Sequence, residues 1–287
     1  MEAGVSDYEL RALPISQRDA TFHVLGERRS FGLRRFELGP CGLYVHPPVA
    51  NGEMEGTVRE ILNSLRKPHT LSFTWNVRFD DKELEECLRQ HGLSETQSTT
   101  HVLQLLADYP STFSKFNATI RNQIRRAERD GVTVRRATTP ELVSAYHQLH
   151  LELVEEKGSF NIVYPEKLFQ ELVRLEQDVW LLLAEFQGQV IGGAVFLRDG
   201  DSLLYWHSSA RRAFSKQFPA CALLNRAIQL AHELNLRTVN FGASAGKPSL
   251  EQFKSFWAAE PQTCYRFSWT NQFWKLTQRL TRRIYAG

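Results

Sequence analysis

The hydrophobic and polar pattern of the chain predicts alternating strands and helices. Apolar residues occupy every second position of residues 71–77, which is the pattern of a half-buried strand. Residues 180–185 and 190–197 form two apolar runs, and the segment Phe186-Gln187-Gly188-Gln189 between them predicts a hairpin. Shorter strands are expected at 203–208 and at 238–241, where Gly242 ends the second one.

Apolar residues spaced three or four positions apart predict the helices. Residues 111–130 have this spacing, and Gly131 stands where a helix commonly ends. The apolar positions concerned are Phe113, Phe116, Ile120, Ile124 and Ala127. Further helices are predicted over 54–65, 82–91, 140–156, 165–176, 219–234 and 250–257.

A weak internal repeat indicates a tandem duplication. The tetrapeptide Leu43-Tyr44-Val45-His46 is echoed by Leu204-Tyr205-Trp206-His207. After each copy come proline, a predicted helix, a strand, a second helix and another strand. The pattern predicts an α/β protein with mixed sheets flanked by helices, in two domains over residues 1–110 and 111–287.

The composition is that of an ordinary globular protein and excludes a disordered chain. Of 287 residues, 42% are hydrophobic and 23% are charged, and the net charge of +3 is too small to require a nucleic-acid partner. The four cysteines are scattered, so neither a disulfide framework nor a zinc site is expected. With no secretory signal and no apolar run long enough to span a bilayer, we expect a cytoplasmic protein without a transmembrane segment.

Three segments together carry a resemblance to a known family. They are the basic helix 121–129 with Gly131-Val132, the strand, turn and helix of 203–234, and Asn240-Phe241-Gly242-Ala243-Ser244 with the later Phe253-Lys254. In this order they resemble the FemAB-like transferases, a branch of the GNAT acyltransferase superfamily whose members build peptidoglycan cross-bridges. The resemblance spans about residues 111–269.

The resemblance implies two tandem GNAT-like domains, of which 1–110 is degenerate and 111–287 carries the transfer site and a C-terminal helix. It also implies an enzyme that forms an amide by moving an activated acyl group onto an amine. The acceptor would be a small-molecule amine, a cell-envelope precursor or a secondary metabolite, and no DNA is involved. The cross-bridge enzymes take their acyl group from aminoacyl-tRNA, whereas many GNAT relatives use acyl-CoA. No tightly bound cofactor and no metal are expected.

A non-catalytic alternative stays open, in which a degenerate GNAT pair binds RNA or an anionic ligand.

Lys254 is the leading catalytic candidate. It resembles the lysine of the family's F-K motif, which implies that it neutralises negative charge on the donor or on the developing oxyanion, with Phe253 beside the donor. The alternative is a solvated lysine on an amphipathic helix whose core face holds Phe253, Phe256 and Trp257.

Tyr205 and His207 are further catalytic candidates. Because side chains alternate along a strand, the two are predicted to share one face. His207 would accept the proton of the amine and Tyr205 would orient the acceptor. The echo at Tyr44 and His46 favours the alternative of a purely architectural pair.

Two other groups are candidates for binding the donor. Asn240, Gly242 and Ser244 end a strand, where open α/β sheets place ligands, although a plain turn would have the same residues. The basic loop 211–219 contains Arg211, Arg212 and Lys216 but no glycine. GNAT enzymes that use coenzyme A carry a glycine-containing loop here, so its absence weakens the acyl-CoA alternative.

Basic residues on two helices suggest contact with anions. Arg121, Arg125 and Arg129 are four residues apart and predict a stripe suited to the phosphates of tRNA, or else a solvated charged face. Residues 273–285 mix apolar and basic side chains. Peripheral membrane contact and packing on the domains are the two interpretations of that stretch.

Overall fold

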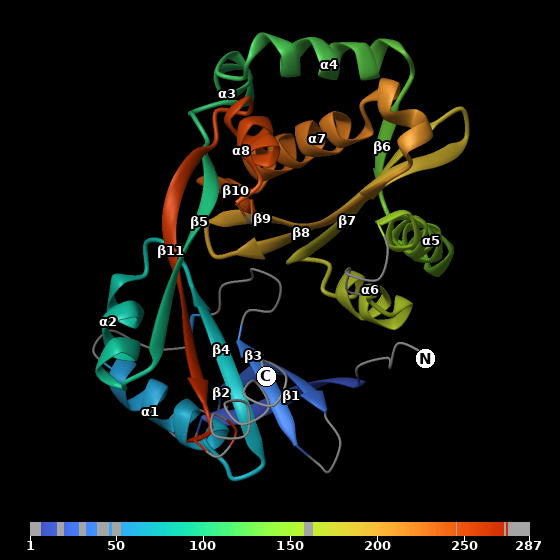
Figure 1. The fold of residues 1–287 in the computed structure, drawn as a ribbon. Helices are drawn as coiled ribbons and strands as arrows, with labels where there is room; N and C mark the ends of the chain where they lie inside the picture. Colours follow the sequence, from blue (N-terminus) through green and yellow to red (C-terminus); the bar gives the residue numbers. More distant parts are fainter. Residues whose placement is uncertain are drawn as a thin grey trace, which may run out of the picture. The chain divides into compact units, whose positions relative to one another are not determined.

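The structure, a computed structural model, describes residues 7–15, 20–28, 33–38, 46–47, 53–157, 163–244, 246–272 and 274. It is an α/β fold with mixed sheets flanked by helices, as the sequence predicts (Figure 1). Contacts within the chain define unit 1, Met1–Thr99 with Thr263–Gly287, and unit 2, Thr100–Gln262. This division differs from a single boundary at residue 110, because β11 (Glu260–Thr270) returns to pair with β4 (Thr70–Val77) of unit 1.

Unit 1 contains a sheet with the strand order β1-β2-β3-β4-β11-β5. Its remaining strands are β1 (Asp7–Ile15), β2 (Ala20–Arg28), β3 (Arg34–Leu38) and the first part of β5 (Ser94–Gln104). The β3 and β4 strands are parallel, whereas β1–β2, β2–β3 and β4–β11 are antiparallel. The helices α1 (Met54–Leu65) and α2 (Lys82–Gln90) bury a core that includes Trp75 and Phe267 against this sheet.

Unit 2 contains the strand order β5-β10-β9-β8-β7-β6. Its strands are β6 (Thr133–Arg136), β7 (Val179–Phe186), β8 (Gln189–Asp199), β9 (Ser202–Ala210), β10 (Thr238–Ala243) and the end of β5. The β9 and β10 strands are parallel, whereas β5–β10, β6–β7, β7–β8 and β8–β9 are antiparallel.

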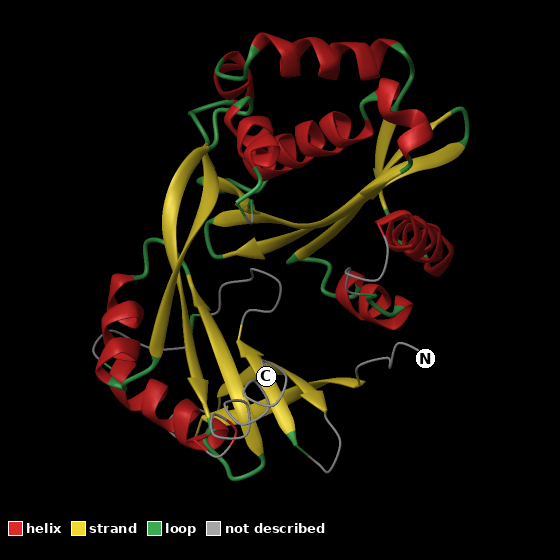
Figure 2. Ribbon diagram, in the orientation of Figure 1, coloured by secondary structure: helices red, strands yellow, loops and turns green. Residues whose placement is uncertain are grey.

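Helices cover both faces of the sheet in unit 2 (Figures 1 and 2). One face carries α3 (Tyr109–Ser114), α4 (Ala118–Arg129), α7 (Pro219–Glu233) and α8 (Pro248–Ser255). The other carries α5 (Pro140–Lys157) and α6 (Glu166–Val173). Among the described residues, no helix is both long and apolar enough to cross a membrane.

The predicted hairpin 180–197 is confirmed as β7 and β8, but the predicted helix 111–130 is interrupted. It forms the separate helices α3 and α4 because Asn117 caps the second one, its Oδ1 accepting the backbone N–H of Thr119 at 2.8 Å. The N–H of Asn117 also donates to the carbonyl of Phe256 at 2.8 Å. The break therefore attaches the start of α4 to the end of α8.

Two expectations concern residues outside the described ranges. They are the first copy of the repeat at Leu43-Tyr44-Val45, and the basic stretch 273–285 with its expected helix, of which the structure describes only Trp274.

Gly193 on β8 allows α5 to approach the sheet closely. A Cβ atom at this position would lie 2.5 Å from Cδ2 of Tyr146 and 2.9 Å from Cδ2 of Leu183. Tyr146 is fully buried on α5, so its ring has no room to move away. The absence of a side chain at Gly193 thus leaves the space that the ring of Tyr146 occupies.

We expect Gly193→Ala to lower the free energy of unfolding by about 1–3 kcal/mol, because the added methyl overpacks the α5 side of the sheet. Urea denaturation followed by circular dichroism measures the change. Gly192→Ala is the comparison variant, and we expect a smaller loss from it, because its Cβ would lie 3.0 Å from Cβ of Pro219 and 3.3 Å from Cβ of Ala210, which is a milder overlap. Equal losses in the two variants would contradict this account of Gly193.

Candidate functional site

A bulge at the end of β10 forms the centre of the candidate site. In the β5–β10 ladder Asn240 pairs with Val102 and Ala243 with Thr100, so that Phe241 and Gly242 lie opposite the single residue His101. Gly242 has φ +72°, a backbone conformation that glycine adopts without strain. The side chain of Asn240 holds the turn, since its Oδ1 accepts the N–H of Gly242 at 2.8 Å and Oγ1–H of Thr100 at 2.6 Å.

Lys254 reaches this turn from α8. Its Nζ donates to the carbonyl of Gly242 at 2.7 Å, and the side chain is 5% exposed. Burial lowers the pKa of Lys254 to about 8, although the carboxylate of Glu251 opposes this effect. The interpretation as a solvated lysine is therefore wrong: Lys254 is a buried amine directed at a strand end.

Other polar groups near the turn have unused hydrogen-bonding capacity. The Nδ1 atom of His101 and the Oγ atom of Ser244 are buried and have no hydrogen-bond partner among the described residues. Because buried polar atoms are usually paired, these two indicate a place where a ligand group or a water belongs. Ser244 was a candidate from the sequence, whereas no motif in the sequence singled out His101.

The strands β9 and β10 separate next to this turn. They pair only from Ser202 to Leu204 on β9, opposite Thr238 to Asn240 on β10, although β9 continues to Ala210 and β10 to Ala243. Parallel strands that diverge leave backbone groups available at the carboxyl end of a sheet, where α/β folds bind ligands. The Gly242 turn and Lys254 lie at this divergence.

Tyr205 and His207 lie on opposite faces of the sheet, which corrects the prediction that they share one. The β8–β9 register pairs Phe196 with Tyr205 but Val195 with His207, so that a bulge at Trp206 interrupts the alternation. Tyr205 stacks on Phe196 at 5.3 Å and its OH donates to Ser208 Oγ at 2.6 Å.

His207 belongs to an aromatic cluster that β9 forms with α5 and α6. Ring centroids of His207 lie 4.9 Å from His150, 5.5 Å from Tyr164 and 5.9 Å from Phe169. His150 is buried and its Nδ1 has no hydrogen-bond partner in the described part of the chain. Tyr146 and His150 are four residues apart on α5, a spacing that the sequence analysis passed over.

Tyr146 on α5 contacts the imidazole of His207 directly. The Tyr146 OH is hydrogen-bonded to Nδ1 of His207, and burial raises the pKa of Tyr146 well above its ordinary value. Because a phenol OH can both donate and accept, this bond is compatible with either tautomer of a neutral His207. The role of His207 as acceptor of the amine proton therefore stays a prediction.

The basic loop between β9 and α7 is largely engaged with α5. Nε and Nη2 of Arg211 donate to the two oxygens of Glu152 at 2.9 and 3.0 Å, and this pair lowers the pKa of the Glu152 carboxyl. Arg212 lies 3.4 Å from Glu156. These four residues are among those that line a cavity of about 270 Å³. Lys216 is exposed, in the 3₁₀ helix η3 (Arg212–Gln217).

The predicted arginine stripe on α4 is only partly available. Arg121 donates from Nη1 to the carbonyls of Ser114 and Phe116, which ties it to the α3–α4 connection. The guanidinium of Arg125 lies 5.6 Å from the ring centre of Phe113, and Arg129 is 75% exposed. Of the three, Arg121 has a structural role and the other two face outward.

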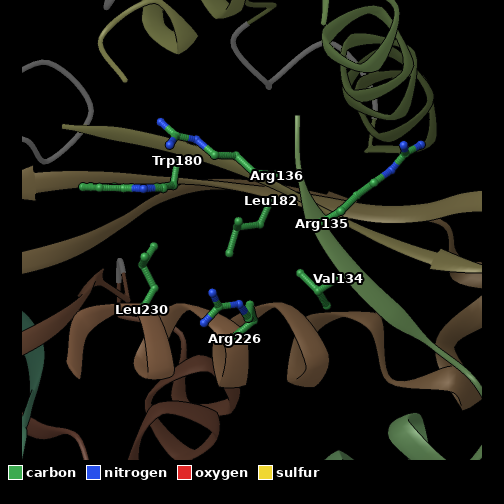
Figure 3. Close-up of a pocket in the computed structure, with 7 residues that line it drawn as sticks. All are labelled: Val134, Arg135, Arg136, Trp180, Leu182, Arg226 and Leu230. Carbon is green, nitrogen blue, oxygen red and sulfur yellow. The ribbon is translucent and has the colours of Figure 1, made fainter. Parts of the chain in front are cut away.

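A second cavity, of about 300 Å³, is enclosed by β6, β7 and α7 (Figure 3). Three arginines line it, and each one already has protein partners. Arg135 pairs with Glu185, Arg226 pairs with Glu233, and Arg136 donates to backbone carbonyls. The cavity shares no lining residue with the Gly242 turn.

Two smaller expectations have structural answers. Phe253 packs against the core of unit 2, with its ring centre 6.2 Å from that of Trp257, so a contact between Phe253 and a donor stays a prediction. In unit 1, Nδ1 of His46 lies 2.6 Å from Asp81, and this hydrogen bond raises the pKa of His46.

The described residues contain no group of three His, Cys, Asp or Glu side chains that would hold a metal ion.

The sequence of the segment that carries this site matches a known protein family. The sequence family described as an acetyltransferase (GNAT) domain matches residues 114–255. No curated protein matches the sequence.

Three solved structures are similar to the chain. FemX has a TM-score of 0.67 at 13% identity, with 96% of this chain and 90% of FemX covered. The C-terminal domain of a putative lysylphosphatidylglycerol synthetase from Agrobacterium fabrum has a TM-score of 0.61 at 11% identity, with coverage of 96% and 88%. A tandem GNAT protein from the clavulanic acid biosynthesis pathway has a TM-score of 0.51 at 14% identity, with coverage of 86% and 78%.

These identities are low, so the three structures establish the fold alone. The match of the GNAT family includes most of unit 2, with Lys254 near its end. Residues 114–255 therefore match the acetyltransferase (GNAT) domain family, within a chain that has the fold of FemX over nearly its whole length.

Proposed function

We propose that the protein is an N-acyltransferase that moves an activated aminoacyl group from aminoacyl-tRNA onto the amine of a small molecule, a cell-envelope precursor or a secondary metabolite. The observation that carries this proposal is the buried amine of Lys254 at the Gly242 turn, inside a GNAT domain. A desolvated ammonium there is suited to stabilising negative charge on an acyl oxygen. Asn240 and Gly242 shape the turn, and Ser244 adds a buried hydroxyl next to it.

The reaction needs an amine, an acyl ester and a group that stabilises the intermediate. The amine lone pair attacks the carbonyl carbon, and the π electrons of the carbonyl move onto its oxygen. Collapse of this oxyanion breaks the ester C–O bond, and the leaving oxygen takes the proton that the amine loses. Lys254 would lower the barrier by stabilising the oxyanion, and His207, on the α5 face of β9, would contact the acceptor.

Two features favour a tRNA-linked donor over acyl-CoA. The loop of Arg211, Arg212 and Lys216 lacks glycine, and both arginines are already paired with α5 carboxylates. One of the similar structures is named a lysylphosphatidylglycerol synthetase, a name that denotes attachment of an amino acid. Acyl-CoA is the second candidate, because the family that matches residues 114–255 is described as an acetyltransferase domain.

A donor screen tests the proposal. Charged tRNAs and acyl-CoAs are each incubated with the protein and a panel of amines, and mass spectrometry detects the amide products. We expect transfer from at least one aminoacyl-tRNA. Transfer from acyl-CoA alone would establish the second candidate. Binding of RNA without transfer from any donor would make this a non-catalytic binding protein.

We expect Lys254→Met to reduce kcat/KM by about a hundredfold or more, as loss of one oxyanion stabiliser does in other enzymes.

In the wild type, kcat should decline as the pH rises through about 8, because the ammonium of Lys254 then loses its proton. Steady-state kinetics from pH 6 to 10 would measure both effects. Lys247→Met, the same change at an exposed residue next to α8, serves as the control. An activity that rises through this range in proportion to neutral Lys254 would instead identify the amine as a base.

A second expectation concerns tRNA. Binding should weaken steeply with salt, and Arg125→Glu combined with Arg129→Glu should reduce the slope of log K against log salt by about one unit for each phosphate that is no longer bound. Fluorescence anisotropy with uncharged tRNA from 50 to 300 mM KCl would measure it. Arg174→Glu, the same substitution at a single 72% exposed residue that follows the last residue of α6, is the control. Equal slopes in the double variant and the wild type would remove α4 from the tRNA-binding surface.

A further inference from the structure

The imidazole of His101 is an unexplained polar group in the core of unit 2. His101 is 5% exposed, and its Nδ1 has no hydrogen-bond partner among the described residues. By the register of β5 and β10 it lies opposite Phe241 and Gly242, the two residues of the bulge. An apolar side chain would fill this position without leaving a buried nitrogen unpaired. The free-energy cost of the unpaired nitrogen therefore suggests that the imidazole has a functional role.

Lys254 reaches the same bulge and acts electrostatically on this imidazole. Its Nζ contacts the Gly242 carbonyl at 2.7 Å, from the same bulge that His101 faces. The pKa of His101 is lowered first by burial and then by the charge of Lys254, so that near neutral pH His101 is uncharged. Glu251 on α8 is the carboxylate that acts on both groups, and it raises the pKa of each.

Lys254 and His101 both have N–H groups that no acceptor of the described protein occupies. An ammonium has three N–H groups, and the carbonyl of Gly242 occupies one of those of Lys254. A neutral imidazole has one N–H, and in the Nδ1–H tautomer that donor is unused inside the protein. A neutral donor next to a cation avoids the repulsion that a second buried charge would add.

We propose that His101 donates a second hydrogen bond to the acyl oxygen that Lys254 stabilises, so that the two side chains form one oxyanion-binding pair at the Gly242 turn. The inference rests on the proposed acyl transfer. In that reaction the carbonyl π electrons move to the oxygen when the amine attacks, and they return when the ester C–O bond breaks. His101 and Lys254 both donate to this oxygen throughout, and neither loses its proton.

Kinetics test the donor role. We expect His101→Leu to lower kcat by about a hundredfold with little change in the KM of either substrate, because the bond forms to an oxygen charged only in the transition state. His101→Asn, whose amide nitrogen can occupy the place of Nδ1, should recover most of kcat. His91→Leu, at a histidine of unit 1 whose pKa is also lowered by burial, is the control. A wild-type kcat in His101→Leu would overturn the proposal, as would a failure of His101→Asn to exceed His101→Leu at equal stability.

A titration that does not depend on activity completes the test. The pKa of His101 is measured by NMR from its Cε1–H resonance, in the wild type and in Lys254→Met. We expect an upward shift in the variant, because a nearby positive charge has been removed. An unchanged pKa would place the two groups too far apart to share an oxygen and would overturn the pair. A wild-type protein that transfers no acyl group would reject the proposed function even if the pKa shifts, so the two failures are distinguishable.

Discussion

The burial of one ammonium group constrains the whole region around the end of β10. A lysine amine can leave water only if a nearby acceptor replaces part of its hydration, and the carbonyl of Gly242 does so here. That carbonyl faces Lys254 because Gly242 adopts a positive φ and the side chain of Asn240 holds the turn. On the other side, the bond from Asn117 to the Phe256 carbonyl anchors the end of α8. The cost of desolvation appears as the lowered pKa of Lys254.

A second bulge divides the polar groups of unit 2 between the two faces of its sheet. Because Trp206 adds a residue to β9, Tyr205 packs with the core under α7, whereas His207 joins the aromatic cluster under α5 and α6. An acyl donor and an amine acceptor have different chemistry, and two faces with different side chains can accommodate them separately. The Gly193 position supports the second face, since it lets Tyr146 approach His207.

Most of the secondary structure could be predicted from the sequence, because periodicity reports which side of an element is buried. The hairpin of β7 and β8 and the helix α7 lie close to where the pattern indicated. What the pattern missed depends on single interactions: the Asn117 cap divides one helix in two, and the bulge at Trp206 reverses the side of His207. For the site, the resemblance identified Lys254, but it carried no information about His101. That residue is 153 positions away in sequence, and only the strand register brings it to the turn.

The path of the chain between the two units has a consequence for synthesis on the ribosome. Unit 2 is one continuous segment, whereas unit 1 needs β11, which is made after unit 2 and contributes the buried Phe267 to the unit 1 core. Until β11 emerges, one edge of β4 has no partner, and an open strand edge of apolar composition invites association with other chains. Unit 1 is therefore begun first but completed last, and the β4 edge that β11 will cover stays open while unit 2 is synthesised.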